Sequence, residues 1–478
     1  MNDMILVLNF SNEFAMEIAR RLRVERVYSR VMSGMTTAAQ IREVAPKGII
    51  LAGEAKSAVG VMDAGILELG IPVLALGHAS HMLLAAQGGA CAGVALSGRK
   101  AAVCCEESAL LRNLYGGERY IEEALVLMLP PDVRMIASAG GCTIAFEKTG
   151  AQQFGVQYEI ERNDPDATTM LMNFARDICG CTPWWTTEAA IAQANGVLEK
   201  AAQGSGRAVC AVSGGVDSTV AALLAHKAFG DRLTAVFMDT GLLREQEKDN
   251  AIALFEKLGI PLLCVDRADA VLDALANKTE RQEKNSVVAR CLYDEVERQS
   301  ASMPDMAYFI RGMNYSDFLH KRYSDEDNYT LEVIDPIGML FKDEVRDAAL
   351  LLGLPEELAQ RKPFPALGLG DRIVGEVSRE RLSMMRTAER IFDEEIREAG
   401  LDRRLYKYFP VLAGTMTRTG GEMIVLRAVT RTSGMLYPAR LPYDLIERVT
   451  QRILEAEPGT SRVFFDYTPT RLDNESFA

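Results

Sequence analysis

The sequence predicts an α/β protein with two parallel-sheet regions and a smaller α+β region after them. Short apolar runs alternate with helical patterns over about the first 355 residues, which is typical of the βα units of parallel sheets. One apolar run, Ala208 to Val212, leads through Ser-Gly-Gly into a helical pattern. Beyond about residue 356 the alternation stops, and prolines, a charged helical pattern and separate strand patterns follow. Several domains are expected, because 478 residues are too many for one core.

In the first region, up to about residue 190, buried strands alternate with helices, and this order predicts a parallel sheet. The expected elements are strands at residues 4–10, 48–53 and 71–77 and a helix at residues 13–22. A helical linker is expected over residues 186–203, and Gly204-Ser205-Gly206 then marks a hinge.

The second region continues the alternation, whereas the third mixes strands and helices as small α+β domains do. In the second region, strands are expected at residues 208–212, 233–239 and 260–266. In the third, helices are expected at residues 378–399 and 443–456, and strands at residues 423–429 and 462–467.

The composition indicates a cytoplasmic protein that has neither a membrane nor a nucleic acid as its partner. Apolar and charged fractions of 48% and 25% are ordinary for globular proteins. No run reaches 18 apolar residues and no signal-peptide pattern is visible, so no membrane partner is expected. A net charge of −13 argues against a nucleic-acid partner. The nine scattered cysteines are interpreted as reduced thiols.

The segment after the strand at residues 208–212 has the chemistry of a polyanion site. Two adjacent glycines allow a sharp turn that presents backbone N–H groups, and the next helix adds its N-terminus. A carboxylate here would repel phosphate, so Asp217 is expected to hold a Mg²⁺. The turn lacks the Gly-Lys-Ser/Thr of a Walker loop. The expected site residues are Ser213, Gly214, Gly215, Asp217, Ser218 and Thr219.

This segment resembles the Ser-Gly-Gly-x-Asp-Ser loop of the ATP pyrophosphatases, and nearly the whole chain resembles the GMP synthetase family. Several local matches in the expected order carry the resemblance. They are Lys47–Gly53, Asn173–Cys181, Val236–Arg244, Leu340–Arg346, Arg361–Pro365, Leu426–Thr430 and Arg440–Asp444.

The resemblance implies three domains. Residues 1–190 would form a class I glutamine amidotransferase-like domain, residues 191–355 an ATP pyrophosphatase domain of the adenine-nucleotide α-hydrolase type, and residues 356–478 a dimerisation domain. It implies a homodimer that uses ATP and Mg²⁺ as an AMP-forming carbon–nitrogen ligase of purine metabolism. A substrate oxygen would be adenylated with loss of pyrophosphate, and ammonia or another nucleophile would then displace AMP.

The resemblance also assigns site residues. Lys342 and Asp217 would serve the phosphates, with Lys342 stabilising charge on the leaving pyrophosphate. The adenosine would be bound along the second strand, at Val236, Phe237, Met238 and Asp239, and Gly312 would be a further ATP-binding residue. The acceptor, a small-molecule substrate, would be bound by Arg311, Tyr315, Asp317 and Arg361.

The amidotransferase-like region departs from its family at the reacting groups. Amide hydrolysis there needs a cysteine at a strand-to-helix elbow and a histidine base. Gly77 stands at the cysteine position, Glu159 at the histidine position, and Glu54 in the oxyanion loop. We expect the fold without glutaminase activity. Polar neighbours without an assignable carboxylate are interpreted as ordinary surface or core residues: His78, Ser80 and His81.

The segments that hold xanthosine monophosphate in the family are altered as well. Arg311–Asp317 replaces Gln-Gly-Thr-x-Tyr-Pro-Asp, and no Lys-Ser-His-His lid lies between Asp317 and Leu331. Pro365–Gly368 replaces Pro-Gly-Pro-Gly, and Thr470–Ser476 replaces Lys-Pro-Pro-x-Thr-Ile-Glu. We expect xanthosine monophosphate to be a poor substrate, and the acceptor and nucleophile stay open.

Two other function classes remain open. One is a divergent ATP pyrophosphatase acting on a nucleoside, an RNA or a sulfur-transfer acceptor, which would require a persulfide cysteine or a basic RNA face. Cys210 precedes the loop but lies in an apolar strand, so it is expected in the core. The other is a non-catalytic nucleotide-binding paralogue, against which the intact loop argues.

Overall fold

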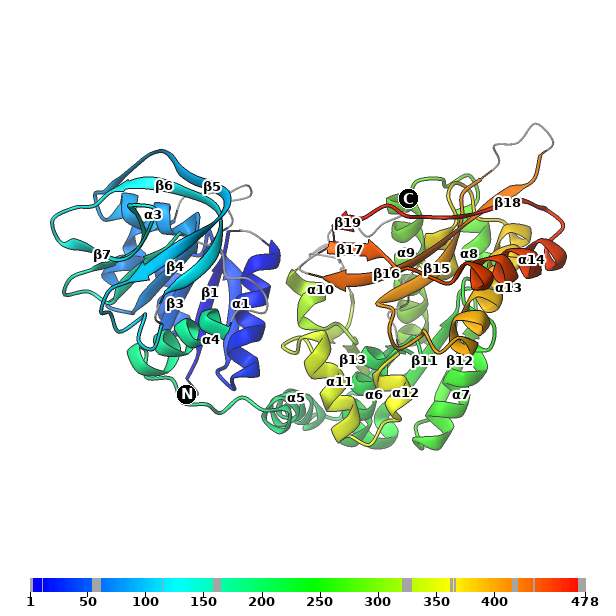
Figure 1. Cartoon of the computed structure of the whole chain (residues 1–478). Helices are drawn as coiled ribbons and strands as arrows, with labels where there is room; N and C mark the ends of the chain where they lie inside the picture. Colours follow the sequence, from blue (N-terminus) through cyan, green and yellow to red (C-terminus); the bar gives the residue numbers. More distant parts are fainter. Residues whose placement is uncertain are drawn as a thin grey trace. The chain divides into compact units, whose positions relative to one another are not determined.

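A computed structural model describes residues 3–10, 12–53, 62–114, 116–157, 165–319, 329–361, 364, 367–414, 420–432 and 435–471 (Figure 1). The chain divides into two compact units, residues 1–190 and residues 191–478. A boundary near residue 355 stays a prediction. In the part of the chain that is described, no helix combines the length and apolar character that crossing a membrane requires.

One nine-stranded sheet builds the first unit, and its first half is parallel with the order β2-β1-β3-β4-β9. Its central strands are almost completely buried, as strands covered on both faces are. These strands are β1 (Ile5–Asn9), β2 (Ser29–Ser33), β3 (Gly48–Gly53), β4 (Val73–Gly77) and β9 (Gln153–Val156). The α-helices of this unit are α1 (Asn12–Val24), α2 (Ala38–Val44), α3 (Ala79–Ala86) and α4 (Pro165–Met172).

The second half of this sheet is antiparallel, in the order β9-β8-β7-β5-β6, and it extends the parallel half that the sequence predicts. The strands are β5 (Ala90–Cys105), β6 (Gly117–Met128), β7 (Val133–Ala139) and β8 (Cys142–Lys148). The β5–β6 register shifts twice between Ala92 and Leu96. Such shifts disturb the period-two alternation by which a strand is recognised in a sequence.

The second unit begins with a five-stranded sheet in which every pair is parallel, in the order β12-β11-β10-β13-β14. Its strands are β10 (Arg207–Val212), β11 (Leu233–Asp239), β12 (Leu262–Asp266), β13 (Met306–Ile310) and β14 (Glu332–Ile334). Its helices are α5 (Thr187–Ala202), α6 (Val216–Phe229), α7 (Glu247–Lys257), α8 (Ala268–Leu275), α9 (Arg281–Ser302), α10 (Tyr315–Leu319), α11 (Lys342–Leu351) and α12 (Glu356–Ala359).

The strand order reverses at β10. The chain runs from β10 outward through β11 to β12, and later returns to the other side of β10 with β13. The turns that leave β10 and β13 therefore diverge at the carboxyl edge of the sheet. In open α/β sheets, such a switch point is where ligands bind.

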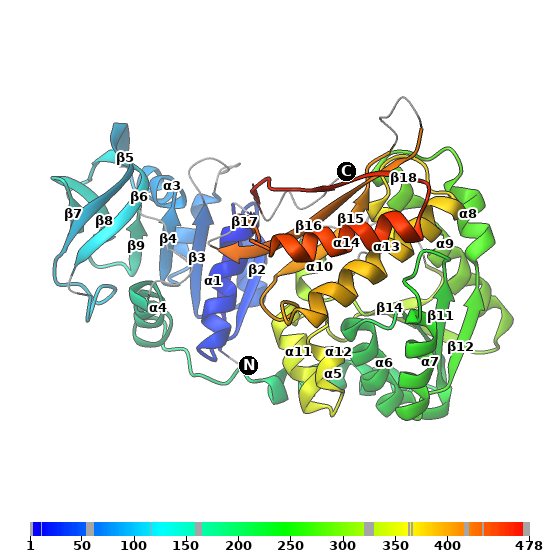
Figure 2. The same cartoon turned by 45° about the vertical axis from the view of Figure 1, so that its right-hand side comes forward.

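A mixed sheet and two helices form the rest of the second unit. The strands are β15 (Lys407–Leu412), β16 (Glu422–Thr432), β17 (Met435–Pro438), β18 (Thr460–Phe465) and β19 (Thr470–Arg471). Figure 2 shows α13 (Arg379–Glu398) and α14 (Tyr443–Ala456) lying side by side along this sheet. The apolar core beneath them also takes in Leu242, Val271 and Val288 from the parallel-sheet part. Residues 356–478 therefore share a core with the preceding region.

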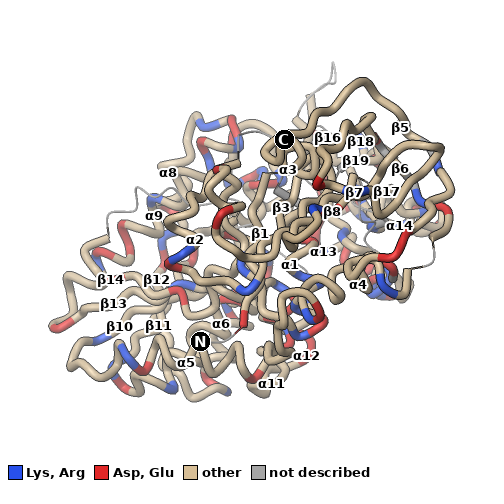
Figure 3. Tube along the Cα trace, turned by 90° about the vertical axis from the view of Figure 1, so that its left-hand side faces the viewer, with Lys and Arg blue, Asp and Glu red and all other residues tan. Residues whose placement is uncertain are grey.

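Charged residues are interspersed over the molecule. In the view of Figure 3, basic and acidic residues alternate along the helices and loops. Several pair between neighbouring elements: Glu395 of α13 accepts hydrogen bonds from Arg448 and Arg452 of α14, both at 3.0 Å. Pairing of this kind accommodates a buried carboxylate at the interface between the two helices.

Candidate active site

The turn after β10 joins that strand to the N-terminus of α6. Gly214 has a φ of +72°, in the left-handed region that glycine adopts without steric cost. Gly215 follows as the extended N-cap of α6. The first N–H groups of a helix have no acceptor within the helix, so this turn presents donors for an anion.

Side-chain hydroxyls fix the shape of this turn. Ser218 Oγ accepts from the N–H of Ser213 at 3.1 Å and donates to the carbonyl of Gly215 at 3.2 Å. Thr219 Oγ1 donates to the same carbonyl at 2.8 Å. Both hydroxyls lie in the buried first turn of α6, whereas Ser213 is exposed. The turn is therefore preorganised, with Ser213 left on the open side.

Asp217 forms an ion pair with Lys342, which is the first residue of α11. The pair links α6, and with it the candidate phosphate loop at residues 213–219, to a second helix N-terminus. Burial raises the pKa of the Asp217 carboxyl, Lys342 lowers it, and the charge of Asp317 raises it again. The net direction is upward, so the ionised carboxylate is held at a cost to folding.

Oδ1 of Asp217 is buried and has no hydrogen-bond partner within the described structure. An unpaired buried carboxylate oxygen is unfavourable, and a hard divalent cation would satisfy it. The charge of Asp317 adds to this demand. The site thus fits Mg²⁺ with Asp217 as ligand. No cluster of three His, Cys, Asp or Glu side chains suited to a metal occurs in the described ranges, so phosphate and water would complete the shell.

The turn after β13 closes against the start of α6. A Cβ on Gly312 would lie 2.6 Å from Cα and 2.7 Å from N of Ser218, so this approach requires glycine. Tyr315 starts α10, and its N–H donates to the carbonyl of Leu340 at 2.8 Å. Its ring centroid lies 5.0 Å from that of Phe341, the N-cap residue of α11. Gly312 and Tyr315 therefore lie beside the Asp217–Lys342 pair.

Arg311 is engaged by a carboxylate that the sequence analysis did not single out. Its Nε and Nη2 donate to Asp335 at 3.0 and 2.8 Å. Burial raises the pKa of Asp335, and Arg311 lowers it. Asp317 accepts the N–H of Asn314 at 3.1 Å, at the start of α10. Substrate contacts by Arg311 and Asp317 stay predictions.

The residues expected to pass the adenosine lie on β11, next to β10. Val236, Phe237 and Met238 are buried. Asp239 accepts the N–H of Gly241 at 3.0 Å and pairs with Lys248 at 3.3 Å. The side chains of this strand are committed to the core and to the following turn, which leaves backbone groups as the means of contacting a base.

Arg361 contacts the phosphate loop itself. Its Nη1 donates to the carbonyl of Gly214 at 3.3 Å, and its Nη2 pairs with Glu247 of α7. Glu247 and Asp335 are functional candidates that sequence reasoning missed. A single acidic residue carries no sequence signal of its ion-pair partner, and only the folded chain brings each one to its arginine.

The first unit retains a strand-to-helix elbow at Gly77, which ends β4 with a φ of +64°. A Cβ there would lie 2.3 Å from the carbonyl oxygen of Gly53. The N–H of His78 donates to that same oxygen at 2.7 Å. In such elbows this N–H follows the nucleophile and serves the oxyanion. Here a carbonyl occupies it, while Glu54 and Glu159 lie outside the described residues.

The polar side chains after the elbow are paired within the fold. Ser80 Oγ donates to the carbonyl of Gly77 at 2.7 Å. His81 Nε2 lies 2.6 Å from Gln157 Oε1, and that amide also bonds both backbone groups of Leu125. Burial lowers the pKa of His81. These contacts give both residues a structural role.

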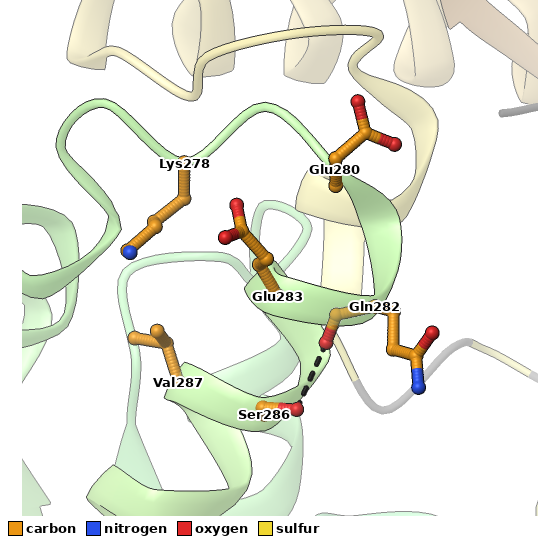
Figure 4. A pocket seen from close by; sticks show the side chains of 6 residues that line it. All are labelled: Lys278, Glu280, Gln282, Glu283, Ser286 and Val287. Atoms are coloured by element: carbon orange, nitrogen blue, oxygen red, sulfur yellow. Dashed lines mark hydrogen bonds between the residues drawn. The ribbon is translucent and has the colours of Figure 1, made fainter.

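A hollow of about 550 Å³ lies at the start of α9 (Figure 4). In it, Ser286 Oγ donates to the main-chain oxygen of Gln282 at 3.0 Å. The lining residues are Lys278, Glu280, Gln282, Glu283, Ser286 and Val287. None of them belongs to the turns after β10, β11 or β13, so the hollow is separate from the candidate site.

Comparison with known proteins places this site in context. Residues 191–294 match the family described as NAD synthase. The glutamine-hydrolysing GMP synthase of Limosilactobacillus reuteri is 32% identical, with 99% of this chain and 98% of that protein covered. Those of Thermosynechococcus vestitus and Symbiobacterium thermophilum are each 34% identical. They cover 97% and 98% of this chain, and 94% and 97% of their own lengths.

Asp217→Asn should separate stability from ATP binding. A carboxyl whose pKa is raised in the folded state destabilises once it ionises, so the wild type should lose stability relative to the variant as pH rises above about 4. At pH 7 the variant should melt no lower than the wild type, yet gain nothing from ATP and Mg²⁺. Thermal unfolding at pH 4.5 and 7 measures both effects. A variant still stabilised by ATP and Mg²⁺ would contradict the role of Asp217.

Proposed function

Because the chain belongs to the GMP synthase family, we propose that it is an AMP-forming, ATP-dependent ligase that hydrolyses no glutamine. It adenylates a substrate oxygen with release of pyrophosphate, and ammonia or another nucleophile then displaces AMP from the adenylated substrate. The family-wide similarity supports the ligase chemistry, and the altered elbow argues for the missing glutaminase.

One observation carries the ATP chemistry. The phosphate loop, the unpartnered Oδ1 of Asp217 and the ammonium of Lys342 meet at the switch point of the parallel sheet. A loop that had lost its role would have no reason to keep a carboxylate with one buried oxygen left without a hydrogen-bond partner, because removing it would improve stability.

The chain's own residues account for the steps as follows. Backbone N–H groups of the loop and of α6 bind the β and γ phosphates, and Ser213 adds a hydroxyl donor. Lys342 places positive charge where pyrophosphate leaves after the substrate oxygen attacks the α phosphorus. Mg²⁺, when bound at Asp217, neutralises phosphate charge. The turn that contains Gly312 packs against the start of α6, covers one side of the candidate site and helps to exclude water from the adenylate.

The acceptor is proposed to differ from xanthosine monophosphate. Thr470 stands where the family resemblance leads one to expect a lysine, and its hydroxyl accepts a hydrogen bond from Arg427 at 2.7 Å. Arg427 is buried and also pairs with Asp466. The positive charge of Arg427 is thus already paired within the C-terminal strand region. Pro365, which begins another altered segment, lies outside the described residues.

ATP–pyrophosphate exchange tests the function directly. With ATP, Mg²⁺ and a competent acceptor, labelled pyrophosphate should enter ATP, and Asp217→Asn should abolish the exchange. Xanthosine monophosphate with ammonium should give GMP far below about one turnover per second, because several lost contacts cost about 1–3 kcal/mol each. GMP formation at that rate would show that the cleft still reads the family substrate. A wild type that binds no ATP would contradict the ligase assignment itself.

Glutamine should not be hydrolysed, either by the wild type or by Gly77→Cys. The substituted Cβ would press on the Gly53 carbonyl, whose oxygen also occupies the His78 N–H. A side chain at this positive φ lowers the stability of the fold by about 1–2 kcal/mol more. Glutamate release with and without ATP is the measurement, with a glutamine-free reaction as control. Release above background by either protein would overturn the inactive elbow.

A homodimer through residues 356–478 completes the proposal. Large aromatic side chains are exposed on β17, on β18, in the segment after β18 and on α14: Tyr437, Phe464, Tyr467 and Tyr443, between 44% and 76%. Light scattering at micromolar concentration should give twice the chain mass. Phe464→Asp should weaken the dimer, whereas Val24→Asp, at an exposed apolar residue of the first unit, should leave it intact. A monomeric wild type would refute this proposal.

A further inference from the structure

We propose that Glu389 of α13 is a positioning residue that fixes the phosphate loop through a chain of ion pairs, an inference that rests on the proposed function. Glu389 lies far beyond Asp217 in the sequence and belongs to the C-terminal region. It would let that region control how well the loop binds ATP.

The turn after β11 lies just before Arg244 in the sequence, and its carbonyl groups accept hydrogen bonds from the C-terminal region. Arg386 of α13 donates to the carbonyl of Gly241 and, at 2.9 Å, to that of Leu243. The N–H of Leu369 donates to the carbonyl of Leu242 at 2.8 Å. Three successive carbonyls of the turn are therefore bonded to residues beyond position 365, which ties its conformation to them.

Glu389 begins the chain of ion pairs by joining two arginines. Its carboxylate oxygens lie 2.5 Å from Nη2 of Arg244 and 2.5 Å from Nη1 of Arg372. Phe364 lies against both guanidinium groups, at 4.3 Å from Arg244 and 5.4 Å from Arg372 to the ring centroid. Stacking and charge together restrict Arg244 to one orientation.

Arg244 continues the chain toward the loop. Its Nη1 lies 4.0 Å from the carboxylate of Glu247. Glu247 pairs with Arg361, and the other arm of Arg361 donates to the carbonyl of Gly214. Gly214 is the residue whose positive φ sets the turn of the phosphate loop. A shift of Arg244 would therefore change the contacts that Glu247 and Arg361 make at the loop.

Burial gives these contacts their weight. Glu247, Glu389 and Arg372 are each less than 9% exposed. Buried charges must stay paired, so the pairs move as a set. Three arginines and two glutamates leave one net positive charge beside the loop, which favours a polyanion there.

The same helix supplies a matched control. Glu395 of α13 is also a buried carboxylate between two arginines, Arg448 and Arg452, but these lie on α14. Glu389→Gln and Glu395→Gln each break a double ion pair on α13. Only the first touches the chain that ends at Gly214.

The experiment compares both variants with the wild type by thermal unfolding and by ATP–pyrophosphate exchange. Both should melt lower than the wild type. Only Glu389→Gln should raise KM for ATP, by about tenfold, with a smaller change in kcat, and it should lose most of the stabilisation that ATP and Mg²⁺ give. Glu389→Asp, which keeps the charge, should recover part of the affinity.

Arg244→Lys provides a second test if Glu389→Gln does not fold, because it keeps the charge and removes the fork that bridges two carboxylates. It should raise KM for ATP in the same way. Equal KM values for the Glu389, Glu395 and wild-type proteins would overturn the inference while leaving the ligase intact. Absence of ATP binding by the wild type would instead overturn the proposed function.

Discussion

The ion pair between Asp217 and Lys342 is the contact around which the candidate site is arranged. It joins the first turn of α6 to the first residue of α11, so two helix N-termini lie beside one half-buried carboxylate. Gly312 brings the turn after β13 against the same helix start. The carboxylate is costly in this setting, since burial raises its pKa and one oxygen stays without a partner. A site that binds a cation and a polyanion together repays that cost.

The strand-turn-helix elements that follow β10 and β4 have the same general shape, but their turns differ in what surrounds them. After β10, Gly214 takes a positive φ. In the first turn of the following helix, the hydroxyls of Ser218 and Thr219 fix the shape of the turn, and Asp217 forms an ion pair with Lys342. After β4, Gly77 also takes a positive φ, but a neighbouring carbonyl fills the space of a side chain. The same backbone geometry thus gives an open turn with polar side chains in one unit and a filled turn in the other, because the surrounding residues decide what each turn can do.

The second unit distributes its charges in a similar way. Buried carboxylates on α13 serve as bridges: Glu395 joins the helix to α14, and Glu389 joins it to the turns around the phosphate loop. Buried pairs add little net stability, but they fix geometry strongly because breaking one leaves a charge uncompensated. This explains how a helix far along the chain can set the position of a loop near its middle.

Local pattern alone determined much of this protein. The buried strands β1, β3, β10 and β11 and the Ser-Gly-Gly turn into α6 follow from apolar runs and glycine, both of which act over a few residues. Asp217 was singled out from the turn that contains it, whereas Lys342 was named only through the family resemblance. The antiparallel strands β5 to β8 escaped prediction, because register shifts, glycines and charges blur their alternation. Only the tertiary structure decided which charges meet. Asp335 reaches Arg311, and Glu389 reaches Arg244, across separations at which a sequence carries no pairing signal. It likewise decided that the Gly53 carbonyl closes the elbow at Gly77, since that contact depends on the register of two parallel strands.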